Sequence, residues 1–90
     1  MIKKEKAREI LKNYLDKHKI EYTRISDKVE FQEEEIPYGK YTDQVKKTYS
    51  LAYFYEGYQN EILIEIVIDA ETGEMLFGLS PTSYLDFYPE

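Results

Sequence analysis

The residues best able to do chemistry are few and scattered in this 90-residue chain. Its one histidine, His18, has no second ligand or base at the spacing that metal sites and nucleophilic sites use. Cysteine is absent, which excludes disulfides and thiolate chemistry. None of the serines stands in a nucleophile elbow, and the four glycines are too dispersed to form a phosphate-binding loop. The sequence therefore predicts a non-enzymatic protein without a metal or a cofactor.

Three carboxylates are the exception that keeps an enzyme among the alternatives. Glu61, Glu65 and Asp69 fall on one face of a predicted strand, with Leu63 and Val67 between them. A half-solvated strand face normally shows this alternation of polar and apolar residues, so a structural role is the simpler interpretation. A carboxyl group with a pKa well above its ordinary value of about 4 would instead support acid–base chemistry.

Tyrosine is the unusual feature of the composition, with ten tyrosines and no tryptophan. Tyrosine is a rigid, amphipathic contact residue that is enriched in interfaces. We therefore predict an acidic, tyrosine-rich surface that binds a protein partner. The predicted contact residues are Tyr38, Tyr41, Tyr53, Tyr55, Tyr58, Glu33, Glu34 and Glu35. For the strand tyrosines the alternative is that Tyr49, Tyr53 and Tyr55 fill the edge of a core with their hydroxyls at its rim.

Charge is divided unevenly along the chain, whose formal net charge is −6. Residues 1–19 hold seven basic and three acidic side chains, whereas the remainder holds five basic and fifteen acidic ones. A negative body repels the phosphates of nucleic acid and attracts a basic protein. No apolar run approaches the roughly 20 residues of a membrane span, and the first residues lack the apolar core of a signal peptide. We expect a cytoplasmic protein that binds neither nucleic acid nor a membrane.

The elements that must position these residues begin with an amphipathic helix. Its apolar stripe has the 3.6-residue period and consists of Ala7, Ile10, Leu11, Tyr14, Leu15 and His18. After Lys19 the pattern predicts one or two short strands, broken around Ser26–Lys28. The acidic stretch Glu33–Lys40 is expected to be a loop, because three like charges, a proline and a glycine disfavour a sheet.

The second half of the chain alternates with the period of strands. We predict strands at Val45–Glu56, Glu61–Asp69 and Met75–Leu79, with a turn at Asp69–Gly73 and either a helical turn or an extended tail over residues 82–88. Four isoleucines on one face of the middle strand form the expected core, and the helix covers them. The result is a single α+β domain, residues 1–90. One helix packs on a curved antiparallel sheet of three to five strands, with a cystatin-like outline.

Three segments of this half follow one another in an order that resembles a known protein family. Residues 49–56 (YSLAYFYE) form an aromatic strand, and residues 66–75 (IVIDAETGEM) an apolar strand, an aspartate-containing turn and a Gly-Glu-apolar restart. Residues 78–88 (GLSPTSYLDFY) place a proline before a tyrosine-containing turn. Together with the amphipathic helix, this series resembles the immunity protein 35 family of bacterial polymorphic-toxin systems. The resemblance implies a non-enzymatic immunity or antitoxin-like protein that binds and neutralises a co-produced toxin.

Two other functions remain open beside the inhibitor and the enzyme. A phage or mobile-element anti-defence protein, binding a host nuclease or another defence effector, would also be small, acidic and free of cysteine. A self-associating domain is the other possibility, since the strand Val45–Glu56 has few breakers and could pair with a second copy if it lay at a sheet edge.

Overall fold

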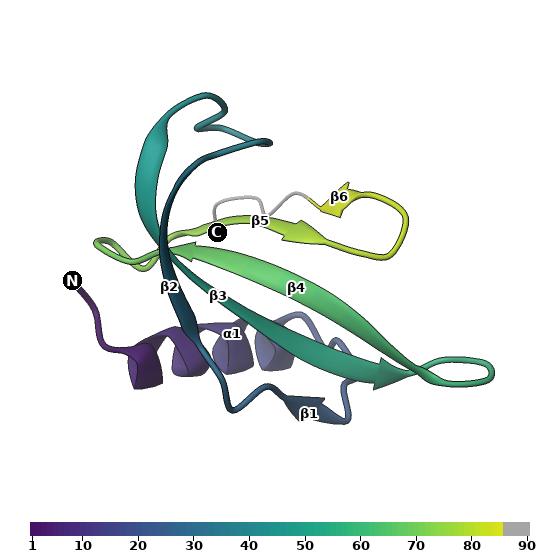
Figure 1. The fold of residues 1–90 in the computed structure, drawn as a ribbon. Helices are drawn as coiled ribbons and strands as arrows, with labels where there is room; N and C mark the ends of the chain where they lie inside the picture. The colour runs from purple at the N-terminus through teal and green to yellow at the C-terminus, as the bar shows by residue number, and fades with distance from the viewer. Residues whose placement is uncertain (86–90) are drawn as a thin grey trace.

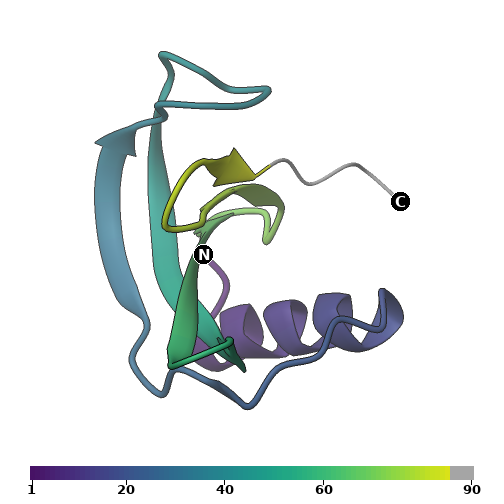
Figure 2. The ribbon, with the colours of Figure 1, turned by 90° about the vertical axis from the view of Figure 1, so that its right-hand side faces the viewer.

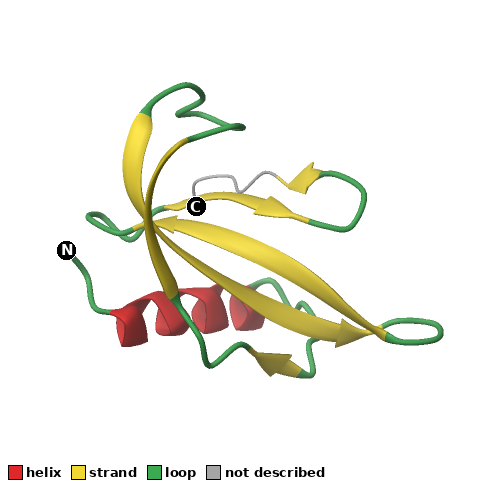
Figure 3. Ribbon diagram, viewed as in Figure 1, coloured by secondary structure: helices red, strands yellow, loops and turns green. Residues whose placement is uncertain are grey.

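The computed structural model describes residues 1–85. Its elements are α1 (Lys4–Lys17), β1 (Arg24–Ile25), β2 (Glu30–Glu35), β3 (Val45–Glu56), β4 (Glu61–Asp69), β5 (Met75–Leu79) and β6 (Tyr84–Leu85) (Figure 1). One helix packs on an open antiparallel sheet of six strands, which confirms the predicted α+β class (Figure 3). Of the predicted closing segment, residues 84 and 85 form a short strand, and residues 86–88 lie outside the described residues.

The sheet is built around β3. β4 and then β5 and β6 follow on one side of it, while β1 and β2 share its other side, at opposite ends. The sheet has six strands rather than the three to five expected, because the two-residue strand β6 adds to the two short and three long strands that the sequence predicted. β3 is therefore paired on both sides, so the expected self-pairing through a free edge of Val45–Glu56 is not available in this topology.

The division of the edge strand falls at Ser26–Lys28, where the sequence predicted a break. The Ser26 amide donates to the Ala52 carbonyl at 2.8 Å, which keeps the chain beside β3. Arg8 Nε of the helix donates to the Ser26 carbonyl at 3.0 Å. The Ser26 hydroxyl oxygen in turn accepts from the Lys28 amide at 3.2 Å. The break is thus a hydrogen-bonded turn that ties the helix to the sheet edge.

The main core lies between α1 and the sheet, as the isoleucine pattern predicted. Ala7, Leu11 and Leu15 are fully buried there. They belong to one cluster with Ile64, Ile66 and Ile68 of β4 and with Tyr49 and Leu51 of β3. Each fully buried leucine or isoleucine of this cluster contributes about 1.5–3 kcal/mol. The docked stripe is what stabilises α1, because an isolated helix of this length is marginal in water.

The end of the helix is closed by a residue in the left-handed region. Lys19 has φ +56°, and the next amide, that of Ile20, donates to the Leu15 carbonyl at 2.9 Å. This geometry satisfies a terminal carbonyl in the manner of a helix C-cap. A lysine here carries the steric cost that a glycine would avoid.

A second core, which the sequence did not predict, lies on the opposite face of the sheet. It consists of Ile36, Val67, Leu76 and Phe77, with Tyr38, Tyr41 and Leu79 packed against it. The loop between β2 and β3 covers it, and Figure 1 shows this end of β2 and β3 rising above β5 and β6. The loop closes on itself where the Ile36 amide donates to the Gln44 carbonyl at 2.8 Å. The sheet therefore buries residues on both faces at this end.

The prediction that residues 33–40 form a loop is wrong at its beginning. Glu33, Glu34 and Glu35 belong to β2, which pairs with β3 over six residues. The register places Glu33 opposite Lys47 and Glu34 opposite Lys46. Facing positions of opposite charge favour an antiparallel pair. Among residues 1–85, however, no ion pair joins these glutamates to the lysines, and Lys46 donates to Asp69 instead.

Candidate functional site

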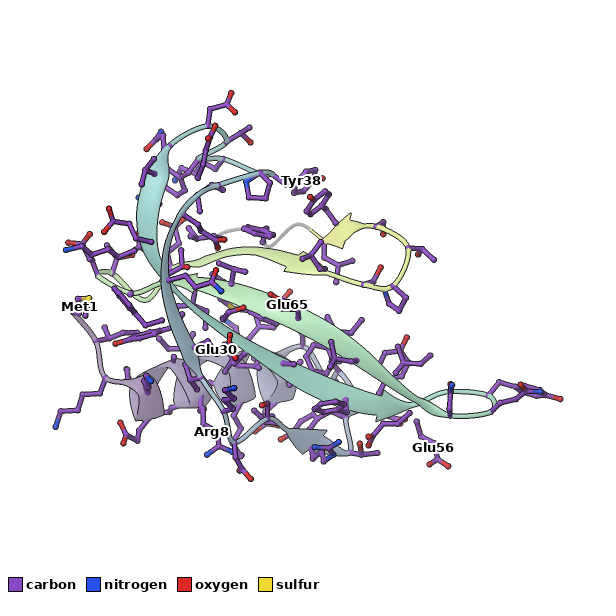
Figure 4. The ribbon with its side chains drawn as sticks, viewed as in Figure 1. Met1, Arg8, Glu30, Tyr38, Glu56 and Glu65 are labelled. Carbon is purple, nitrogen blue, oxygen red and sulfur yellow. The ribbon has the colours of Figure 1, made fainter. Side chains whose placement is uncertain are left out.

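The predicted contact residues fall in four places rather than on one surface. Tyr38 and Tyr41 lie in the loop over the second core, Tyr53 and Tyr55 on the helix side of β3, Tyr58 at the tip of the β3–β4 hairpin, and the three glutamates in β2. Figure 4 shows Tyr38 in the upper part of the view and Glu56, the residue that ends β3 beside the hairpin tip, at the lower right. The structure does not bring the five tyrosines and three glutamates together.

Tyr41 has structural partners. Its hydroxyl donates to Glu74 Oε1 at 2.8 Å, which joins the β2–β3 loop to the turn between β4 and β5. Lys46 Nζ lies 4.2 Å from the centre of its ring, within cation–π distance. Both the polar tip and one face of the ring are thus used within the chain, and Tyr41 serves mainly to hold the loop.

Tyr38 stacks on an aromatic residue far along the chain. Its ring and that of Tyr84 in β6 are nearly parallel, with centroids 4.9 Å apart and an interplanar angle of 7°. Tyr84 also meets the edge of Phe77 at 6.0 Å and remains 43% exposed. These rings close the second core, and the ring of Tyr84 leaves a partly exposed aromatic surface at β6.

Tyr53 and Tyr55 pack against the main core from β3, each half-buried. Burial raises the pKa of the Tyr53 hydroxyl above its ordinary value, with the neighbouring Tyr55 adding to the effect. Tyr49, the third strand tyrosine, is buried, and its hydroxyl donates to the Ile2 carbonyl at 2.8 Å. The strand tyrosines therefore line the core, which is the arrangement that the alternative interpretation predicted for them.

Tyr58 and the β2 glutamates remain open to solvent. Tyr58 is 99% exposed at the hairpin tip, where the Gly57 amide donates to the Asn60 carbonyl at 2.9 Å and closes the turn. Glu33 and Glu35 are exposed, and Glu34 is half-buried, accepting from the Thr48 hydroxyl at 3.3 Å. Among residues 1–85, none of these three glutamates has a cation within ion-pair distance.

The edge strand β2 contains two further exposed residues that were not among the predicted contact residues. Glu30 extends the acidic series to four residues in six, and Phe31 is 44% exposed. Phe31 meets the edge of Tyr49 with ring centroids 5.9 Å apart. The signal that could have extended the predicted strand through Glu35 is the match between Glu33-Glu34-Glu35 and the basic pair near the start of β3, Lys46 and Lys47.

The face of the sheet opposite α1 is uncovered in its middle part. A groove there is lined by Glu30 and Gln32 of β2, Ser50 and Ala52 of β3, and Leu63 and Glu65 of β4. Figure 4 shows Glu30 and Glu65 on this central part of the sheet. Leu63 is 46% exposed in it. The groove is open and shallow, and it extends from the edge strand across the sheet.

The three carboxylates of β4 each have a local partner. Glu61 accepts from Arg24 at 3.0 Å and from the Thr23 hydroxyl at 2.9 Å, and these bonds lower the pKa of its carboxyl group. Glu65 accepts from the Ser50 hydroxyl at 2.7 Å. For Glu61 the shift is opposite to the one that a general acid requires.

Asp69 is the most buried of the three. Its Oδ1 accepts from the amides of Glu71 at 2.8 Å and Thr72 at 3.2 Å, as the predicted turn required. Gly73 completes this turn with φ +82°. Burial alone raises the pKa of Asp69, but the two amides and the Lys46 ammonium, 3.2 Å from Oδ2, outweigh it and lower the pKa. Asp69 is thus a charged anchor of the β4–β5 turn.

Residues 1–85 contain no group of three or more histidine or carboxylate side chains that could hold a metal ion. In the same part of the chain, no helix is long and apolar enough to cross a membrane. Comparison of the chain with family models, with curated proteins and with solved structures found no match. The resemblance to immunity protein 35 thus stays a prediction made from the sequence. Three of the predicted contact residues lie in β2, and two of them, Glu33 and Glu35, are exposed.

Proposed function

We propose that this chain is a small, non-enzymatic protein-binding inhibitor of the immunity or antitoxin kind, which holds a basic protein partner at its acidic edge strand β2. The observation that carries this proposal is the placement of Glu33, Glu34 and Glu35 in an edge strand, without an ion-pair partner among residues 1–85. Unneutralised charge at an open margin attracts a basic partner and speeds its association.

Inhibition in this proposal takes place by occlusion. A protein that acts on nucleic acid needs a basic working face to meet phosphates. Covering that face with an acidic protein of 90 residues blocks the substrate without any chemistry by the inhibitor. The net charge of −6 supports this role and disfavours nucleic acid as a direct partner. The setting that fits is the cytoplasm, without attachment to a membrane.

Affinity capture from the source cell with the tagged chain tests the proposal. We expect one stoichiometric basic protein, identified by mass spectrometry, whose own activity falls to zero at an equimolar ratio of the purified chain. A toxin encoded beside the chain would indicate an immunity protein, and a host nuclease would indicate an anti-defence protein. Failure to recover any stoichiometric partner, with the chain eluting as a folded dimer, would contradict the proposal and favour self-association.

A matched pair of variants tests the surface. Glu33→Gln with Glu35→Gln removes two charges from β2, and Glu56→Gln with Glu71→Gln removes two exposed charges elsewhere. We expect the first double variant to slow association with the captured partner about tenfold and the second to leave it nearly unchanged, because steering depends on where the charge lies. Equal rates for both variants would place the contact surface away from β2.

A further inference from the structure

The outer side of β2 is a free strand margin. Within residues 1–85, β2 pairs only with β3, over all six of its residues. Figure 2 shows β2 as the outermost strand, on the side of the sheet away from α1. The amide and carbonyl groups on the outer side of such a strand are arranged to pair with another extended chain. The outer side of β2 can therefore bind a partner through its backbone amide and carbonyl groups as well as through its charged side chains.

The other margins of the sheet offer less. β6, at the opposite side, has two residues. β4 extends beyond the end of β5 by the four residues 61–64, beside the turn that contains Ser80 and Pro81. Of the free margins among the described residues, β2 has the longest regular stretch.

The inner side of β2 shows what kind of strand it accepts. β3 begins Val45-Lys46-Lys47-Thr48, and its two lysines stand opposite Glu34 and Glu33 in an antiparallel register. Facing charges of opposite sign favour such a pair, and facing charges of the same sign disfavour it. The chain thus contains, within itself, a basic strand seated along this acidic one.

We infer that β2 binds an extended basic segment of its protein partner by strand addition, with the segment antiparallel to β2 as β3 is. The inference rests on the proposed function and names the geometry of its contact. The alternate glutamates of β2 oppose lysine or arginine side chains on both faces of the sheet, and Phe31 offers an apolar contact on the helix side. Backbone hydrogen bonds provide affinity in this mode, and side chains provide selectivity.

A second copy of the chain is disfavoured as the occupant of this margin. Antiparallel pairing of β2 with another β2 would bring two runs that are each four glutamates in six residues against each other. Charged edge strands are a common way of preventing such edge-to-edge association. The same charges that exclude a second copy select a basic segment.

A peptide of residues 45–52, VKKTYSLA, is the probe, because it copies the strand that β2 already accepts. The matched control is VEETYSLA, which replaces the two lysines with glutamates and so reverses their charge. In a titration of the 15N-labelled chain, we expect VKKTYSLA to shift the amide signals of residues 30–35 in a saturable manner and to leave those of α1 unchanged. We expect VEETYSLA to give at least tenfold weaker binding. Equal binding of the two peptides, no saturable shift, or shifts confined to other strands would each overturn the inference.

Backbone pairing is tested with two N-methylated forms of VKKTYSLA, one methylated at alternate odd positions and the other at the even positions. Only one set of amides of an added strand faces its neighbour. We expect one form to lose binding at least tenfold and the other to retain it within threefold. Retention or loss of binding by both forms alike would show that charge, not strand addition, holds the peptide.

The outcomes separate this inference from the proposed function. Suppose that VKKTYSLA does not displace a captured partner and that Glu33→Gln with Glu35→Gln does not weaken its binding. The proposed inhibitor function would then stand, and strand addition at β2 would be overturned. Specific binding of VKKTYSLA, with no partner captured from the cell, would support strand addition at β2 and contradict the proposed inhibitor function.

Discussion

Lys46 Nζ donates to Asp69 Oδ2 at 3.2 Å, although the two residues are 23 positions apart in the chain. Asp69 is only 3% exposed, and Lys46 also lies over the ring of Tyr41. This contact joins the beginning of β3, the end of β4 and the loop that covers the second core. A buried charge needs such partners, because an unpaired one is costly in a protein interior.

Asp69→Asn is expected to lower the free energy of unfolding by about 1.5–3 kcal/mol, the value typical of a hydrogen bond to a charged group. An asparagine still accepts from the amides of Glu71 and Thr72 but gives Lys46 no charge. Urea unfolding of the two proteins near neutral pH measures the difference. The control is Asp27→Asn, which removes an exposed carboxylate 3.5 Å from Arg8 and should cost less than about 0.5 kcal/mol.

The stabilisation by Asp69 should depend on pH in a definite direction. Its pKa is lowered in the folded state, where the amides and Lys46 outweigh burial. The contribution is thus present above the unfolded pKa of about 3.9 and is lost as the pH falls through the folded pKa. Unfolding measured at falling pH should show the difference between wild type and Asp69→Asn shrinking below about pH 4. A difference that stayed constant into that range would contradict the charged role of Asp69.

Tyr41→Phe should lower stability by about 0.5–1 kcal/mol, because it removes one exposed hydrogen bond, to Glu74, and keeps the ring beneath Lys46. Tyr58→Ala should leave stability within about 0.5 kcal/mol, since its side chain is exposed at the hairpin tip. Thermal unfolding of both variants distinguishes a residue that holds the loop from one that does not. A larger loss for Tyr58→Ala than for Tyr41→Phe would reverse these assignments.

Two positions of β4 on opposite faces test which face of the sheet carries the main core. Ile66→Ala should cost about 2–5 kcal/mol, because Ile66 is 1% exposed beneath α1. Leu63→Ala, in the open groove on the other face, should cost less than about 1 kcal/mol. Denaturant unfolding measures both. Similar costs at the two positions would mean that something covers the groove in solution.

Lys19→Gly should raise stability by about 0.5–1 kcal/mol, because Lys19 has φ +56° and a glycine adopts this conformation without steric cost. The matched control is Lys19→Ala, which also removes the charge but keeps the Cβ atom, and it should bring no gain. The thermal midpoints of the three proteins give the comparison. A gain for both variants would assign the effect to the lysine charge.

Much of the fold could be predicted because its signals are local. The alternation of Glu61–Asp69 places four isoleucines on one face whatever their partners are, and the bounds predicted for β3, β4 and β5 agree with the structure. The turn at Asp69–Gly73 was predicted, because it depends on residues within the turn itself: Asp69 accepts from the Glu71 amide, and Gly73 has φ +82°.

The candidate site could not be predicted in this way, because it depends on which segments meet. Whether a glutamate run is a loop or a strand is decided by its neighbour, and only the register with Lys46 and Lys47 shows that β2 continues through Glu35. The same applies to the tyrosines, since the ring of Tyr38 finds Tyr84 across 46 positions of sequence.

The sequence by itself thus determined the helix, the three long strands and the acidic, tyrosine-rich composition, because periodicity and turn chemistry act over a few residues. The tertiary structure decided which tyrosines enter a core, that a second core exists beneath residues 36–44, and that the glutamates stand on a free strand margin. These features arise from strand order and register, which are set by contacts between segments far apart in the chain.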